Sequence, residues 1–114
     1  MIDYHIHLEQ GFYTLDWLIR FWHQARNRGL QEIGITEHTH RFEEFRPVYE
    51  HLWTDSRCDP VVAAWMGKEF KYSLEDYFKL LDEGRRVGIP LKIGLEADYF
   101  PRSEERLRSL LKTC

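Results

Sequence analysis

The chain has 114 residues, of which 43% are hydrophobic, 31% charged and 15% aromatic, and its formal net charge is −3. That length suits one domain with a modest core, and the mixed charges exclude the broad basic surface of a nucleic-acid-binding protein. No apolar run reaches membrane-spanning length and no secretory signal is visible, so we expect a cytoplasmic protein without a membrane partner. Cys58 and Cys114 are expected to be free thiols.

Three strands are predicted at residues 2–8, 32–36 and 91–97. Each is followed by a helical segment, and this strand-helix order favours an α/β fold with a parallel sheet covered by helices.

The first two long helices have recognisable ends. One is predicted to begin at Thr14, which can cap it, and to end at Gly29. The other is predicted to begin at Ser73, where Ser73 and Asp76 resemble a capping box, and to end at Gly88.

A long connection, residues 37–72, follows the second strand. Two short helical pieces are predicted in it, one beginning at Pro47 and one at Pro60 behind the capping candidate Asp59. Its many aromatic side chains suit a lid or substrate-shaping loop, or a loop buried against the sheet. A last helix is predicted to begin at Ser103.

Each predicted strand has one apolar face and one polar or small face, because successive side chains of a strand point to opposite sides. The residues of the polar faces are Asp3, His5, His7, Glu9, Gly34, Thr36, His38, Lys92, Gly94, Glu96 and Asp98. Those that can bind a metal gather toward the carboxyl ends of the strands. This arrangement is expected of a barrel with its helices outside and its site at the carboxyl mouth.

The strongest candidate site combines His5 and His7 of the first strand with His38 and Glu96 of the other two. Imidazole nitrogens and carboxylate oxygens are the donors that zinc, manganese or iron require. Glu96 is well placed for a carboxylate that bridges two ions.

Four further residues near these motifs or in the helices are weaker candidates. Glu37 is expected on the helix side of the sheet, where it could support a ligand histidine. His40 could bind a metal, but an exposed loop histidine is the better interpretation. His23 and His51 are expected to be ordinary surface or core residues.

Three segments resemble motifs of the PHP (polymerase and histidinol phosphatase) family. These are Asp-Tyr-His-Ile-His at 3–7, Thr-Glu-His at 36–38 and Gly-Leu-Glu-Ala-Asp-Tyr at 94–99. The sequence around the second motif is most similar to the histidinol-phosphatase branch of the family. The resemblance covers essentially the whole chain.

The resemblance implies a distorted (β/α)7 barrel, similar to a TIM barrel, that holds two or three divalent ions (Zn, Mn or Fe) and hydrolyses phosphate esters. It implies that His5, His7, His38 and Glu96 bind metal and that the attacking group is a metal-bound water rather than a side chain. The implied substrate is histidinol phosphate, an intermediate of histidine biosynthesis.

Three other residues take roles from the same resemblance. Asp3 would orient a ligand histidine. Many members have a further histidine shortly after the first motif, and Glu9 could serve that position here. Arg41, just after the second motif, could hold the phosphate through a forked contact, or could be a solvated loop cation.

The family's later motifs are missing, so residues 1–114 are expected to be the N-terminal portion of one barrel domain. Two alternatives stay open. One is an amidohydrolase-type metal hydrolase, which also begins with a histidine pair on its first strand. The other is a non-catalytic half-barrel that self-associates or pairs with a missing C-terminal half.

Overall fold

A computed structural model describes residues 1–8, 13–54, 60–66 and 68–113. The chain forms two compact units. The first consists of Met1–His38 and Glu75–Glu96, and the second of Thr39–Leu74 and Ala97–Cys114. Asp59, the predicted cap, lies outside the described residues.

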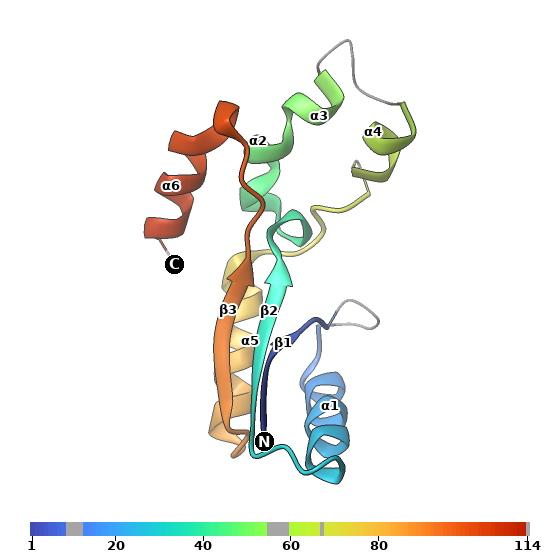
Figure 1. The fold of residues 1–114 in the computed structure, drawn as a ribbon, viewed down its shortest axis with the longest axis vertical. Coiled ribbons are helices and arrows are strands. Elements are labelled where there is room, and N and C mark those ends of the chain that lie inside the picture. Colours follow the sequence, from blue (N-terminus) through green and yellow to red (C-terminus); the bar gives the residue numbers. More distant parts are fainter. Residues whose placement is uncertain (9–12, 55–59, 67, 114) are drawn as a thin grey trace. The chain divides into compact units, whose positions relative to one another are not determined.

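The first unit is built on a three-stranded parallel sheet with the order β1-β2-β3 (Figure 1). The strands are β1 (Ile2–Ile6), β2 (Glu32–His38) and β3 (Leu91–Glu96), joined by α1 (Leu15–Asn27) and α5 (Leu74–Arg86). The predicted α/β class with three parallel strands is therefore confirmed. Strand β2 is two residues longer than predicted, because its end stays in register with β3 up to the pair His38 and Glu96.

Both ends of α1 and the carboxyl end of α5 follow the local signals in the sequence, while the start of α5 depends on a distant side chain. The Thr14 hydroxyl oxygen accepts a hydrogen bond from the Trp17 N–H at 3.3 Å, which caps α1. Gly29 and Gly88 follow the helices with positive φ, as predicted. At the start of α5, the Glu44 carboxylate accepts the Leu74 N–H at 2.8 Å, a long-range contact without a local signal.

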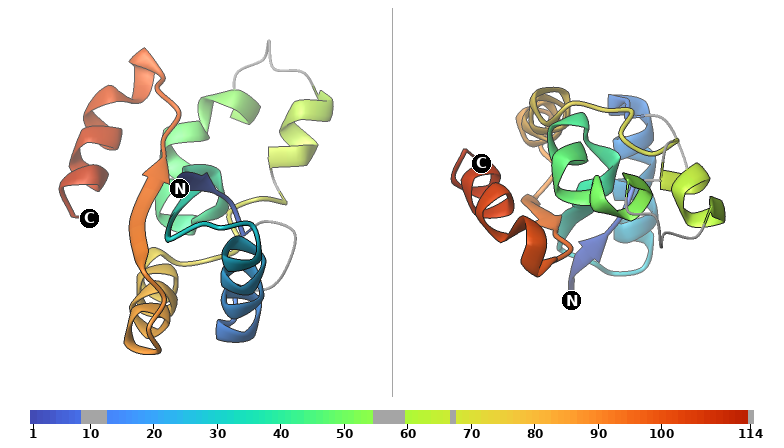
Figure 2. Two further views of the ribbon diagram at one scale, coloured as in Figure 1. Left: turned by 60° about the horizontal axis from the view of Figure 1, so that its bottom comes forward. Right: turned by 90° about the horizontal axis from the view of Figure 1, so that it is seen from above.

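Both helices cover the same side of the sheet (Figure 2). Leu18 of α1 lies so close to α5 that a Cβ atom added at Gly84 would be 2.5 Å from its Cδ2 atom. The apolar side chains between helices and sheet form the core of this unit. Its fully buried members include Leu18, Ile33, Ile35, Tyr77 and Leu81.

Strand β1 does not alternate regularly. Asp3 is paired with Ile33 and Ile6 with Ile35, so three steps along β1 match two along β2. This register shift is a bulge, which lets two residues of one strand face one residue of its neighbour. It turns Asp3 toward the helix side, and the predicted placement of Asp3 on the polar face is wrong.

Tyr77 of α5 connects to both β2 and β3. It is fully buried, and its hydroxyl lies within donor distance of the Ile35 carbonyl (3.1 Å) and the Gly94 carbonyl (2.8 Å). Burial raises the pKa of the Tyr77 hydroxyl, so it keeps its proton and remains a donor.

The second unit consists of short helices. They are η1 (Thr39–Arg41), η2 (Glu43–Phe45), α2 (Arg46–Tyr49), α3 (His51–Thr54), α4 (Pro60–Met66), η3 (Pro101–Ser103) and α6 (Glu104–Lys112). The two pieces predicted near Pro47 and Pro60 are present. The last helix begins near Ser103, whose hydroxyl donates to the Val48 carbonyl at 2.8 Å instead of capping α6.

Tyr49 is the polar anchor of the second unit. Its hydroxyl is 2.5 Å from the Thr39 hydroxyl and donates to Asp98 at 2.9 Å, which joins the segments that follow β2 and β3. Within the described residues, no helix has both the length and the apolar character needed to cross a membrane.

Replacing Tyr77 by Phe tests the contribution of its hydroxyl to β2 and β3. We expect Tyr77→Phe to lower the free energy of unfolding by about 1–2 kcal/mol, because it removes a donor from buried carbonyls. Tyr99→Phe is the control, since Tyr99 is 60% exposed. Urea unfolding of both variants measures the difference, and an equal effect of the two substitutions would contradict the role of the Tyr77 hydroxyl.

Candidate metal centre

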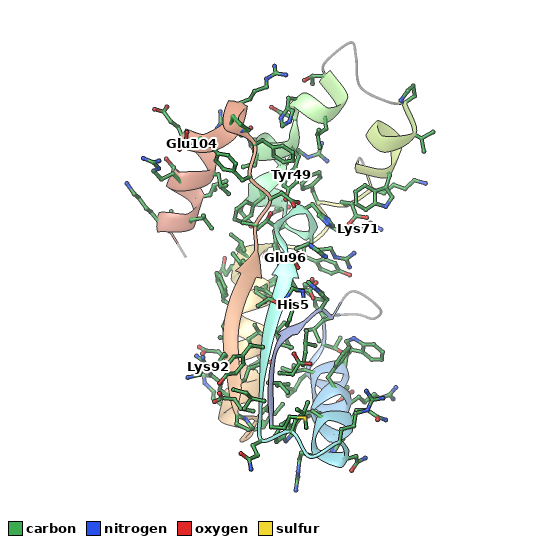
Figure 3. All side chains as sticks on the ribbon, viewed as in Figure 1. His5, Tyr49, Lys71, Lys92, Glu96 and Glu104 are labelled. Carbon is green, nitrogen blue, oxygen red and sulfur yellow. The ribbon has the colours of Figure 1, made fainter. Side chains whose placement is uncertain are left out.

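The carboxyl ends of the three strands bring the predicted ligands of the first unit together. His5 is in β1, His7 follows it directly, His38 ends β2 and Glu96 ends β3. Figure 3 shows His5 and Glu96 close to each other at this end of the sheet. Carboxyl ends of parallel strands share one edge, and here that edge carries the imidazoles and the carboxylate.

Three donor atoms form a nearly equilateral triangle. The Nε2 atoms of His5 and His7 are 3.1 Å apart, and the Glu96 Oε2 atom lies 3.3 Å from the first and 3.2 Å from the second. Donors that share one tetrahedral zinc ion at about 2.0–2.2 Å are about 3.4 Å from one another. The triangle therefore has the dimensions of three ligands of one ion.

The burial of one oxygen of the Glu96 carboxylate supports the same interpretation. Its Oε2 atom is buried and has no hydrogen-bond partner among the described residues, although three imidazoles surround it. A buried carboxylate oxygen needs a proton donor or a cation. A divalent ion would satisfy this oxygen and both Nε2 atoms at once, and the donor set contains no thiolate.

His38 flanks the triangle without belonging to it. Its Nδ1 atom is 3.6 Å from Glu96 Oε2, and its ring stacks on that of His7 with centroids 4.4 Å apart and an interplanar angle of 5°. His38 therefore reaches the same carboxylate as His5 and His7 from a neighbouring strand. From this position His38 would be able to hold a metal ion beside the triangle.

Glu37 lies on the other face of β2 and is completely buried. Its carboxylate accepts hydrogen bonds from the Leu8 N–H and the Tyr13 hydroxyl, and its Oε1 atom is 4.0 Å from His7 Nδ1. This placement agrees with the predicted helix-side position. The carboxylate thus fixes the backbone next to His7 and faces the ring nitrogen that is not in the triangle.

Asp3 acts on the backbone of the site. Its Oδ1 atom accepts the His5 N–H at 2.9 Å, while the bulge turns the residue toward α1. The carboxylate therefore holds the strand at His5 but contacts no ligand imidazole.

The remaining candidates lie elsewhere. Glu9 is outside the described residues. In the second unit, the Glu69 Oε2 atom is 3.2 Å from His40 Nδ1 and 3.5 Å from Arg41 Nη1. The Arg41 guanidinium also lies 5.5 Å from the centre of the Tyr72 ring. His40 and Arg41 thus share the carboxylate of Glu69, a residue that belongs to none of the motifs.

Two contributors to the site also had no sequence signal. Tyr13 and Tyr77 reach the end of β2 through their hydroxyls, from positions distant in the chain. Each looks like an ordinary aromatic core residue in the sequence. His23, in contrast, is exposed, as expected.

Comparison of the chain with protein-family models, with curated proteins and with solved structures found no match. The case for a function therefore depends on the geometry of the site and on the resemblance of its motifs.

Replacing Glu37 by Gln tests whether the buried carboxylate organises the site without metal. A carboxylate offers two acceptor oxygens and an amide only one, so Glu37→Gln leaves one buried donor poorly paired. We expect the free energy of unfolding in EDTA to fall by about 1–3 kcal/mol. The exposed Glu105 provides the control Glu105→Gln, and equal urea midpoints for the two variants would contradict the structural role of Glu37.

Proposed function

We propose that this chain is the metal-binding N-terminal portion of a PHP-type phosphomonoesterase. The observation that carries the proposal is the triangle of His5 Nε2, His7 Nε2 and Glu96 Oε2, with edges of 3.1–3.3 Å. The three parallel strands would be the first three of a seven-stranded barrel.

Zinc, manganese and iron are the metals that the donor set favours, because imidazole and carboxylate bind all three. His5, His7 and Glu96 would hold one ion. His38, beside the same Glu96 oxygen, would contribute to a second ion in a complete site of two or three.

A pair of divalent ions supplies a water acidified to near-neutral pKa and neutralises charge on a phosphoryl group. The chain's own residues provide the frame for this chemistry. Glu37 holds the Leu8 amide, next to His7, and its Oε1 atom lies 4.0 Å from His7 Nδ1. Asp3 holds the His5 amide, so carboxylates from the helix side of the sheet hold the backbone at His5 and directly after His7.

The proposed substrate is a phosphomonoester, with histidinol phosphate first by the resemblance of the second motif. Arg41 could hold its phosphate only in competition with Glu69, whose carboxylate lies 3.5 Å away. A cytoplasmic location and a role in histidine biosynthesis follow from the same proposal.

One observation favours the second candidate, a non-catalytic half-barrel. The side chain of His5 is 67% exposed, and that of Glu96 is 40% exposed. Such a site can bind a metal, but its exposed ligands leave it in contact with bulk water instead of enclosing a substrate. An amidohydrolase-type activity is the remaining enzymatic alternative.

Metal binding tests the triangle directly. We expect the purified chain to bind one zinc ion tightly in a calorimetric titration, and His7→Ala to weaken this binding by at least about 100-fold, because it removes one of three protein ligands. His23→Ala is the matched control on the exposed face of α1 and should bind as the unchanged chain does. Equal affinities of the two variants would contradict the site.

Phosphate release tests the reaction. We expect hydrolysis of histidinol phosphate and of p-nitrophenyl phosphate in the presence of zinc, manganese or iron, and loss of both activities on chelation or in His7→Ala. Turnover of amide substrates in place of phosphate esters would favour the amidohydrolase alternative. Tight metal binding without any turnover would favour the non-catalytic half-barrel.

A further inference from the structure

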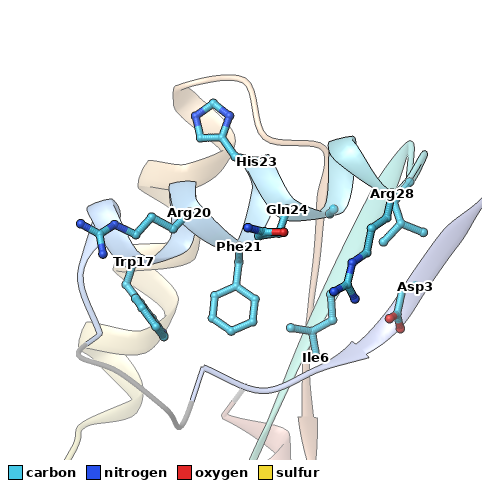
Figure 4. Close-up of a pocket in the computed structure, with 10 residues that line it drawn as sticks. Asp3, Ile6, Trp17, Arg20, Phe21, His23, Gln24 and Arg28 are labelled. Atoms are coloured by element: carbon cyan, nitrogen blue, oxygen red, sulfur yellow. The ribbon is translucent and has the colours of Figure 1, made fainter.

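Tyr4 lies on the polar face of the sheet, although regular alternation with Ile6 would place it on the helix side. Instead, Asp3 and Ile6 line a cavity between β1 and α1 (Figure 4). The bulge leaves Tyr4 and His5 between them, both opposite Gly34. Tyr4 is therefore next to a candidate metal ligand both in the chain and on the face of the sheet.

Tyr4 contacts β2 at two points. Its backbone and ring lie against Gly34, because a Cβ atom added there would be 2.8 Å from the Tyr4 Cα atom and 3.0 Å from the Tyr4 Cδ1 atom. Its hydroxyl donates a hydrogen bond to the carboxylate of Glu32, which lies in the same strand as Gly34. The two contacts together fix the spacing and the register of β1 and β2 directly before His5.

The triangle of metal ligands requires this spacing to be set closely. Strands β1 and β3 lie on opposite sides of β2, so their backbones are roughly 10 Å apart. The His5 ring has to reach across β2 to bring its Nε2 atom 3.3 Å from Glu96 Oε2. Because a zinc–nitrogen bond is about 2 Å long, a shift of β1 by about 1 Å would take His5 out of binding distance.

Asp3 and Tyr4 hold the strand at His5 from opposite faces of the sheet. On the helix side, the Asp3 Oδ1 atom accepts the His5 N–H at 2.9 Å. On the polar face, Tyr4 supplies the contacts to β2. Packing in an apolar core does not explain these contacts, because Tyr4 is 44% exposed. They determine where β1 lies rather than how much apolar surface it buries.

We propose that Tyr4 is a positioning residue of the metal centre, which sets the distance between His5 and Glu96 through its contacts with Gly34 and Glu32. It binds no metal itself. The inference rests on the metal centre of the proposed function, but it does not depend on the phosphatase reaction.

Zinc affinity in a calorimetric titration tests the role of the side chain. We expect Tyr4→Ala to weaken zinc binding by at least about tenfold, the usual cost of losing a group that holds a metal ligand in place. Tyr4→Phe keeps the ring on Gly34 and should recover part of this loss. Tyr99→Ala is the matched control, since Tyr99 is 60% exposed, and should bind zinc as the unchanged chain does.

Gly34→Ala tests the same contact from the other strand. The added methyl group meets the Tyr4 backbone and forces β1 away from β2, so we expect a loss of zinc affinity of at least about tenfold. Gly94→Ala is the matched control, because its Cβ atom would lie 3.1 Å from the Thr36 Cγ2 atom, a side-chain methyl of β2, and near no atom of β1. Circular dichroism in EDTA confirms the fold of each variant; if Gly34→Ala is unfolded, Tyr4→Ala decides.

The visible absorption of Co²⁺ bound in place of zinc separates positioning from stability, because it depends on the arrangement of the ligands. We expect Tyr4→Ala saturated with Co²⁺ to give a changed spectrum. An unchanged spectrum in the folded variant would overturn the proposal, as would zinc affinities of Tyr4→Ala and Gly34→Ala equal to those of their controls. Both results leave the metal centre intact, whereas failure of the unchanged chain to bind zinc would overturn the metal centre as well.

Discussion

The bulge in β1 is the constraint on which the rest of the first unit depends. It places Tyr4 and His5 opposite a single residue, Gly34, and so separates the roles of neighbouring residues. Asp3 and Ile6 turn to α1, while His5 and His7 meet Glu96. Gly34 makes this possible, because a Cβ atom there would lie 2.8 Å from the Tyr4 Cα atom. With any larger residue, β1 would have to move away from β2 and take both histidines with it.

A second constraint is electrostatic. Glu37 is a charged residue without any exposed surface, and such burial is costly unless the charge is well paired. Its partners are the Leu8 N–H and the Tyr13 hydroxyl, with His7 Nδ1 4.0 Å away. The same carboxylate therefore anchors the backbone directly after His7 and lies close to a ligand ring. Stability of the fold and geometry of the site are coupled at this residue, and a change there cannot affect one alone.

The sequence predicts the features that have a local cause. Thr14 caps α1, Gly29 and Gly88 end the helices, and the apolar alternation of β2 and β3 identifies the face that meets the helices. The convergence of His5, His7 and Glu96 follows from the same alternation, since the carboxyl ends of parallel strands meet at one edge.

What the sequence does not predict depends on contacts between distant residues. The face of Asp3 depends on a bulge that exists only through pairing with β2. The Tyr77 hydroxyl lies within donor distance of carbonyls on two strands and Glu44 caps α5, yet no pattern around either residue signals these contacts. The spacing of apolar residues does not reveal side chains that form hydrogen bonds with backbone groups far away in the sequence. Here such side chains position the ends of the strands.

The metal ligands and the open edges have a common origin in the polarity of this sheet. Parallel sheets usually bury both faces, and the sequences of their strands are then continuously apolar. Here one face is polar, so it cannot be covered by an apolar layer and is left for ligands. An ion held by His5, His7 and Glu96 would link β1 to β3 across β2. Because an unfolded chain cannot present the three donors together, such an ion would stabilise the folded sheet as well as supply chemistry. Metal binding would thus strengthen both outer strands, β1 and β3, each of which pairs only with β2 among the described residues.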